Sequence, residues 1–210
     1  IMRRTGDKVL LITSTIPAEG KTMTSVNMAL AFAQEGMKVA LLDGDLRKPS
    51  VSELMKLPEG PGLTEYFRGE STPEEIQVVK DGVTFFRAGQ KKGKVSGLID
   101  EEKMNSLLEK LRKEYDVILM DAAPSYVFSD AMILSSYADK VLYVVRVDKA
   151  DAKEIRVGMN SFEEKETDVR IATKILSDAY KKRCDIAIIV SADSDLIPPV
   201  ELIREFNPLQ

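Results

Sequence analysis

The chain has 210 residues, with 30 Lys and Arg against 34 Asp and Glu, no His, no Trp and a single Cys. Without imidazole there is no Ser-His-Asp or Cys-His catalysis and no zinc site that needs His. One cysteine, Cys184, excludes an internal disulfide framework and a multi-cysteine metal site. The net charge of −4 gives no general electrostatic reason to bind nucleic acid or an anionic membrane, so neither partner is expected.

The first eight residues are too polar for a signal peptide, and the longest apolar runs are strand-sized. None approaches the roughly 20 residues that a membrane-spanning helix needs. We therefore expect a soluble, cytoplasmic chain with no direct membrane insertion, even if it is a piece of a membrane protein. Its length and its 44% of hydrophobic residues are consistent with one domain, or two small ones at most.

Short apolar runs alternate with helical patterns along the chain. The runs predict strands at 8–14, 39–42, 83–87, 117–120, 141–147 and 184–191. The apolar periodicity predicts helices at 21–35, 101–115, 129–137, 151–162, 167–182 and 198–206. The stretch 48–93 is rich in Pro and Gly and predicts loops around its one strand. This alternation favours an α/β fold with a doubly wound, mainly parallel sheet.

The sharpest motif lies between the first predicted strand and helix. It reads Pro17, Ala18, Glu19, Gly20, Lys21 and Thr22. In a P-loop, backbone N–H groups and a lysine bind a polyphosphate, and the Ser or Thr hydroxyl ligates Mg²⁺. The usual first Gly of the P-loop pattern is Thr15 here. The alternative is a strand–turn–helix junction that happens to contain Gly-Lys-Thr.

Three aspartates follow predicted strands. Asp43 and Asp45 come after the second strand, and Asp121 comes after the apolar run 117–120. The carboxyl ends of parallel strands share one edge, so these side chains and the P-loop should converge there. Carboxylate oxygens suit Mg²⁺. The alternative is that the aspartates only cap helices or turns.

With these motifs in place, residues 8 to about 160 resemble the bacterial tyrosine kinases of capsule and exopolysaccharide synthesis. Those kinases belong to the P-loop NTPase superfamily of MinD and ParA. The matching segments are 12–22 (Walker A), 41–49 (the A′ motif, with D-x-D-x-R) and 117–121 (Walker B). Ile16 stands where MinD and ParA proteins carry a signature Lys, which favours the kinase branch.

The resemblance implies ATP and Mg²⁺ as cofactors. It places residues 17–22 and Arg47 on the nucleotide, and Thr22, Asp43 and Asp121 at the metal. Asp43 would be the base or a metal-orienting carboxylate, with Asp45 beside it and Lys21 on the phosphates. The implied partners are the nucleotide and either a membrane activator protein or further copies of the chain.

Two departures from the kinase pattern favour nucleotide binding over autokinase activity. The family ends in a tyrosine cluster, whereas the tyrosines here are scattered at 66, 115, 126, 137, 143 and 180. The segment after Walker B reads Ala-Ala-Pro where the family has Thr-Pro-Pro.

Residues 163–208 resemble a different family, the second half of a NYN domain. NYN domains are PIN-like ribonucleases that bind a divalent metal, and the implied acidic positions are Asp168, Asp193 and Asp195. The alternative is a helix N-terminal Asp plus a solvated turn.

Forty-six residues are too few for an independent core. We therefore expect a chimera, made by recombination or design, that folds as one P-loop domain over 1–210. Its kinase-like part would be 1–162, and the NYN-like part 163–210 would supply the last β-α unit. A right-handed crossover through 167–182 would place the strand 186–190 parallel to its neighbour.

Three functions follow from these patterns. The first is an ATP- and Mg²⁺-binding protein with phosphoryl transfer or ATP hydrolysis. The second is a metal-dependent ribonuclease, and the third is a chimeric scaffold without turnover.

Overall fold

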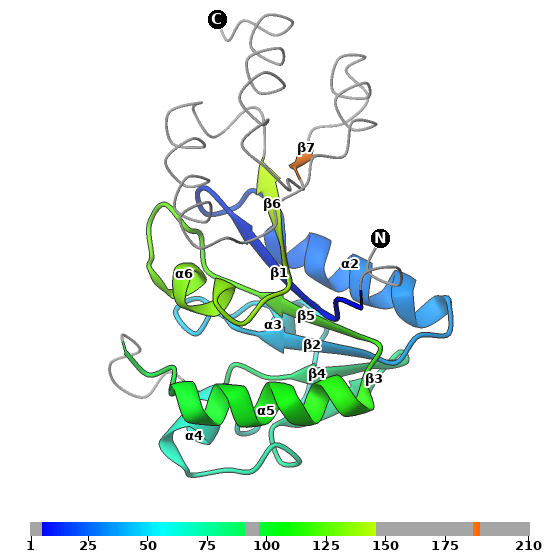
Figure 1. Ribbon diagram of the computed structural model, residues 1–210, viewed down its shortest axis with the longest axis vertical. Coiled ribbons are helices and arrows are strands. Elements are labelled where there is room, and N and C mark those ends of the chain that lie inside the picture. The colour runs from blue at the N-terminus through cyan, green and yellow to red at the C-terminus, as the bar shows by residue number, and fades with distance from the viewer. Residues whose placement is uncertain (1–5, 91–96, 146–186, 190–210) are drawn as a thin grey trace, which may run out of the picture.

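The computed structural model describes residues 6–90, 97–145 and 187–189 (Figure 1). Its strands form one seven-stranded sheet in the order β3-β4-β2-β5-β1-β6-β7. The helices expected at 151–162, 167–182 and 198–206 lie outside the described residues. So do Asp168, Asp193 and Asp195, and their predicted metal site stays a prediction.

The centre of the sheet is parallel. β1 (Val9–Ser14) lies between β5 (Val117–Asp121) and β6 (Lys140–Val145), and both pairings are parallel. β2 (Val39–Asp43) pairs in parallel with β5 on one side and with β4 (Val83–Phe86) on the other. β3 (Gln77–Lys80) is antiparallel to β4 at one edge. The predicted doubly wound, mainly parallel sheet is confirmed.

Helices cover both faces of this sheet, and Figure 1 shows α2 and α5 on opposite sides of it. α2 (Lys21–Gln34) and α3 (Val51–Leu54) pack on one face. α4 (Leu63–Arg68), α5 (Glu101–Glu114) and α6 (Asp130–Ser135) pack on the other. Strand side chains alternate between the faces, so each buried strand supplies both cores.

α5 shows why its boundaries could be predicted. Its N-cap, Asp100, accepts a hydrogen bond from the amide of Lys103 at 2.9 Å. Acidic residues occupy the first turn and basic residues the last, which suits the helix dipole. The buried positions follow the helical period, and they are Met104, Leu107, Leu108 and Leu111.

Residues 48–90, the described part of the segment 48–93, contain more secondary structure than we predict, namely α3, α4 and β3 in addition to β4. α4 is fixed by distant contacts: the amide of Leu63 donates to the carbonyl of Arg87 at 2.7 Å. Gly62, just before α4, must be a glycine, since a Cβ there would lie 2.1 Å from the amide of Gly89. Such contacts leave no periodic signal in a short helix.

The predicted last strand was wrong in its direction. β7 (Ala187–Ile189) lies beside β6, as expected, but runs antiparallel to it. Antiparallel neighbours need no right-handed crossover between them, so the argument for a parallel strand does not apply at this edge.

Within the described ranges, no helix combines the length and the apolar character needed to cross a membrane.

Candidate nucleotide-binding site

The loop between β1 and α2 joins the end of a buried strand to the first turn of a helix. Gly20 adopts the left-handed conformation with φ 98°, directly before the first turn of α2. Pro17 and Ala18 are exposed, whereas Glu19 is fully buried. The Oε2 atom of Glu19 accepts a hydrogen bond from the amide of Ile16 at 2.8 Å. Glu19 therefore holds the loop from inside, a role that the motif alone did not reveal.

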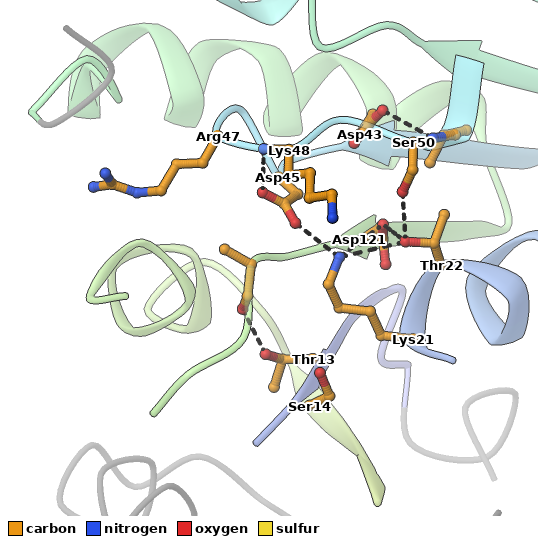
Figure 2. A network of polar contacts seen from close by, with 12 residues as sticks. Thr13, Ser14, Lys21, Thr22, Asp43, Asp45, Arg47, Lys48, Ser50 and Asp121 are labelled. Atoms are coloured by element: carbon orange, nitrogen blue, oxygen red, sulfur yellow. Dashed lines mark hydrogen bonds and ion pairs between the residues drawn. The ribbon is translucent and has the colours of Figure 1, made fainter. Parts of the chain in front are cut away.

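Lys21 lies at the centre of the site (Figure 2). Its Nζ atom is 2.9 Å from Oδ2 of Asp45 and 3.5 Å from Oδ2 of Asp121, and all three side chains are buried. Burial by itself lowers the pKa of Lys21, but the carboxylates of Asp121 and Asp45 outweigh it and raise that pKa above its usual value. The lysine is thus held as a cation.

Thr22 and Ser25 tie α2 to the end of β5. The Thr22 hydroxyl is 2.7 Å from Oδ2 of Asp121, and the Ser25 hydroxyl donates to Oδ1 of the same carboxylate at 2.9 Å. Ser25 was not predicted as a site residue. It follows Thr22 by three positions and Lys21 by four, so it shares their face of the helix, and that spacing could have identified it.

Asp43 ends β2 and is fully buried. Its Oδ2 accepts a hydrogen bond from the amide of Val51 at 3.2 Å. Its Oδ1 has no hydrogen-bond partner among the described residues. Burial and the nearby charge of Asp121 raise the pKa of Asp43 well above its usual range. A buried carboxylate oxygen without a donor is the place where a cation would be stabilised.

These residues fit Mg²⁺ bound together with a nucleotide. In the part of the chain that the structure describes, no group of three or more acidic or Cys side chains is arranged to hold a metal by itself. Mg²⁺ does not need such a cage, because it is usually held by one or two carboxylates, substrate phosphates and water. Asp43, with its unpaired oxygen, and the Thr22 hydroxyl meet that requirement.

Arg47 is not brought to the loop. It forms an ion pair with Asp130 at the start of α6, and its guanidinium lies 4.6 Å from the ring centre of Phe128. Figure 2 shows its side chain pointing away from the cluster around Lys21. The Asp130 hydrogen bond raises the pKa of Arg47. The structure therefore gives Arg47 a packing partner, and its predicted nucleotide contact stays a prediction.

A parallel sheet with a Gly-Lys-Thr loop facing strand-end carboxylates defines a P-loop NTPase, and the family comparison agrees. The ParA family, described as NUBPL iron-transfer P-loop NTPase, matches residues 6–155. The chain belongs to this family of P-loop NTPases. Curated proteins that the chain is similar to include bacterial tyrosine-protein kinases.

CpsD of Streptococcus pneumoniae, a tyrosine-protein kinase, is 31% identical over 167 residues, which cover 75% of this chain and 70% of that protein. The tyrosine-protein kinase etk of Escherichia coli is 30% identical over 183 residues. The solved kinase domain of that enzyme superposes with a TM-score of 0.75, at 30% identity, over 79% of this chain and 66% of the domain.

A more distant structure has the same fold. Cobyrinic acid a,c-diamide synthase of Mycobacterium smegmatis, solved with an ATP analog and magnesium, matches at 18% identity with a TM-score of 0.61. It covers 75% of this chain and 68% of the synthase. Several of the matched kinases are much longer than this chain. The chain spans only about a quarter of the length of etk and of the kinases from Acinetobacter johnsonii and Klebsiella pneumoniae.

The NYN domain family matches residues 103–208. The resemblance at 163–208 is therefore confirmed, but the match begins 60 residues earlier than the boundary that we expected. Its first part overlaps the ParA match and contains most of α5 together with β5, α6 and β6, which belong to the P-loop fold. Both family matches therefore include residues 103–155.

Proposed function

We propose that this chain binds ATP with Mg²⁺ at the loop 17–22 and transfers the γ-phosphoryl group to a tyrosine hydroxyl. One observation supports this most strongly: Lys21, Thr22, Asp45 and Asp121 converge beside a buried oxygen of Asp43 that has no partner among the described residues. A structural junction has no need for a buried cation beside an unpaired carboxylate oxygen.

The chain's own groups would divide the work. Lys21 would leave Asp45 to bind the β- and γ-phosphates. Thr22 and Asp43 would hold the metal, and Asp121 would orient Thr22 through their 2.7 Å hydrogen bond. When bound, the metal would neutralise charge on the phosphates as the transfer proceeds.

The transfer itself forms one bond and breaks one. The tyrosine oxygen attacks the γ-phosphorus while the bond from phosphorus to the β,γ-bridging oxygen breaks, and ADP leaves. With Asp43 at the metal, the tyrosine proton would pass to the carboxylate of Asp45. Attack by water in place of tyrosine would give ATP hydrolysis at the same site.

The similarity to CpsD and etk supports a kinase of exopolysaccharide synthesis in the cytoplasm. A membrane activator protein or further copies of the chain would then be its macromolecular partners. We also propose that residues 1–210 form one domain, with the pairing of β7 and β6 joining the NYN-like part to the P-loop sheet.

ADP release from ATP, together with phosphotyrosine on the chain or on a poly-Glu-Tyr peptide, tests the proposed transfer. Wild-type protein should release ADP with Mg²⁺ present, and Lys21→Met should not. Lys110→Met is the matched control, because Lys110 pairs with Glu74 on the surface of α5, away from the loop. Equal ADP release by wild type and Lys21→Met would refute the assignment.

A metal-dependent ribonuclease is the second candidate, and the NYN match over residues 103–208 favours it. It would depend on Asp168, Asp193 and Asp195. RNA cleavage that is lost in Asp193→Asn but kept in Lys21→Met would establish it, whereas cleavage by neither wild type nor Lys21→Met would remove it. If neither activity is found, the chain is a scaffold without turnover.

A further inference from the structure

Ser50 contacts the candidate metal site, although neither the motif nor the proposed function uses it. Its hydroxyl lies 3.1 Å from the hydroxyl of Thr22, 28 positions earlier in the chain (Figure 2). Ser50 occupies the N-cap position of α3, where a serine ordinarily bonds to the first amides of its own helix. Here its side chain makes no such capping bond. The hydroxyl is directed to Thr22 instead.

In the contact between the two hydroxyls, Ser50 is the donor and Thr22 is the acceptor. A threonine hydroxyl has one hydrogen and two lone pairs. The short 2.7 Å bond to Oδ2 of Asp121 uses the hydrogen of Thr22, since an ionised carboxylate can only accept. Thr22 must therefore accept from Ser50. Nζ of Lys21 donates to the second lone pair of Thr22 at 3.3 Å. In the proposed function that lone pair becomes available when Lys21 moves to the phosphates.

The residue after Ser50 acts on the other candidate ligand. The amide of Val51 donates to Oδ2 of Asp43 at 3.2 Å, which leaves Oδ1 unpaired among the described residues. The start of α3 thus contacts both candidate ligands. It leaves Oδ1 of Asp43 and the lone pair of Thr22 that faces Lys21 for a cation. A cation between them would meet two oxygens whose other bonds are already made.

We propose that Ser50 is a positioning residue for the divalent cation that accompanies the nucleotide. It donates to Thr22 and so directs the remaining lone pair of that hydroxyl toward the metal. This role rests on the proposed function, because it needs a nucleotide-bound cation. It adds the residue directly after the A′ segment to a site otherwise made by Walker A, A′ and Walker B.

Fluorescent ATP analogue binding, titrated with Mg²⁺ and repeated in EDTA, tests the role. Ser50→Ala should raise the Mg²⁺ concentration for half-maximal binding about three- to tenfold, the range of one lost hydrogen bond. Its affinity in EDTA should stay within about twofold of wild type. Ser50→Thr keeps the hydroxyl and should restore the wild-type Mg²⁺ dependence. Ser52→Ala, the same deletion two positions along α3, should change neither value.

Three results would overturn the role. Ser50→Ala could show the wild-type Mg²⁺ dependence, which removes the inference and leaves the proposed function intact. Ser50→Ala could also weaken binding equally with Mg²⁺ and in EDTA, which would mean a structural effect on the whole site. Finally, wild-type protein could bind no nucleotide in either condition, and then the proposed function fails and this role fails with it.

Discussion

The ammonium group of Lys21 lies 2.9 Å from a carboxylate oxygen of Asp45, across the space between the P-loop and the end of β2. The charge that would bind phosphate is therefore already balanced inside the protein. A nucleotide bound as proposed would have to compete with Asp45 and Asp121 for this lysine. In the proposed function, phosphate binding would therefore release both aspartates from Lys21.

Removing the lysine charge should destabilise the ligand-free protein. Lys21→Met leaves Asp45 and Asp121 buried without their cation, and breaking a buried pair costs about 3–5 kcal/mol. The loss of unfolding free energy relative to wild type should be smaller at pH 5 than at pH 8. Burial raises the pKa values of Asp43 and Asp121, so protonation can replace the missing cation as the pH falls. Urea unfolding at the two pH values measures this.

The surface variant Lys110→Met is the control for this effect and should unfold like wild type at both pH values. An equal loss of stability in Lys21→Met at pH 5 and pH 8 would mean that the buried carboxylates do not respond as described.

The ionised carboxylate of Asp43 should lower the stability of the protein without nucleotide at neutral and alkaline pH. Because its pKa is raised in the folded state, the folded protein holds this proton more tightly than the unfolded chain. Its contribution to the free energy of unfolding therefore falls as the pH rises from about 4, the unfolded value. Asp43→Asn should melt a few degrees higher than wild type at pH 8 and lose Mg²⁺-dependent nucleotide binding. A lower melting temperature at pH 8 would contradict the assignment.

Arg47 should act through α6. Arg47→Ala removes the ion pair with Asp130 and the contact with Phe128, so the free energy of unfolding should fall by about 1–3 kcal/mol. Nucleotide affinity should stay within about threefold of wild type, because the side chain points away from Lys21. A tenfold loss of affinity at unchanged stability would instead support the nucleotide contact that the kinase resemblance implied.

Asp139 links the start of β1 to α5 at the opposite end of the strands. It accepts the amides of Lys8 and Val9, each at 2.8 Å, and a two-pronged ion pair from Arg112. Burial opposes ionisation, but Arg112 and these amides together lower the pKa of Asp139. Its stabilisation is thus present above the unfolded value of about 3.9 and lost as the pH falls through the lowered pKa.

Asp139→Asn should therefore cost about 1–3 kcal/mol at pH 7. The difference from wild type should narrow below pH 4. A constant difference between pH 7 and pH 2.5 in denaturant unfolding would show that ionisation of Asp139 is not the cause.

The sequence was sufficient for the centre of the fold and of the site. β1, β2 and β5 are buried on both faces and leave uninterrupted apolar runs, each of which is followed by a polar residue or loop. Their parallel order brings Lys21, Asp43, Asp45 and Asp121 to one edge. Both facts follow from local patterns and one general rule about parallel sheets.

The remaining features depend on contacts between distant residues. α4 is held by Arg87, Arg47 by Asp130, and Ser50 is 28 positions from Thr22. The direction of β7 is set by its pairing with β6. The hydrophobic pattern of this short strand does not indicate whether its neighbour is parallel or antiparallel. Contacts of this kind form no local sequence motif, so they could not be predicted from the sequence.

Calorimetric titration with a non-hydrolysable ATP analogue tests the central claim most directly. Wild-type protein with Mg²⁺ should bind one equivalent, EDTA should weaken that binding, and Lys21→Met should bind at least tenfold more weakly while Lys110→Met binds like wild type. Undiminished binding by Lys21→Met, or no binding by correctly folded wild-type protein, would contradict a nucleotide site at the loop 17–22.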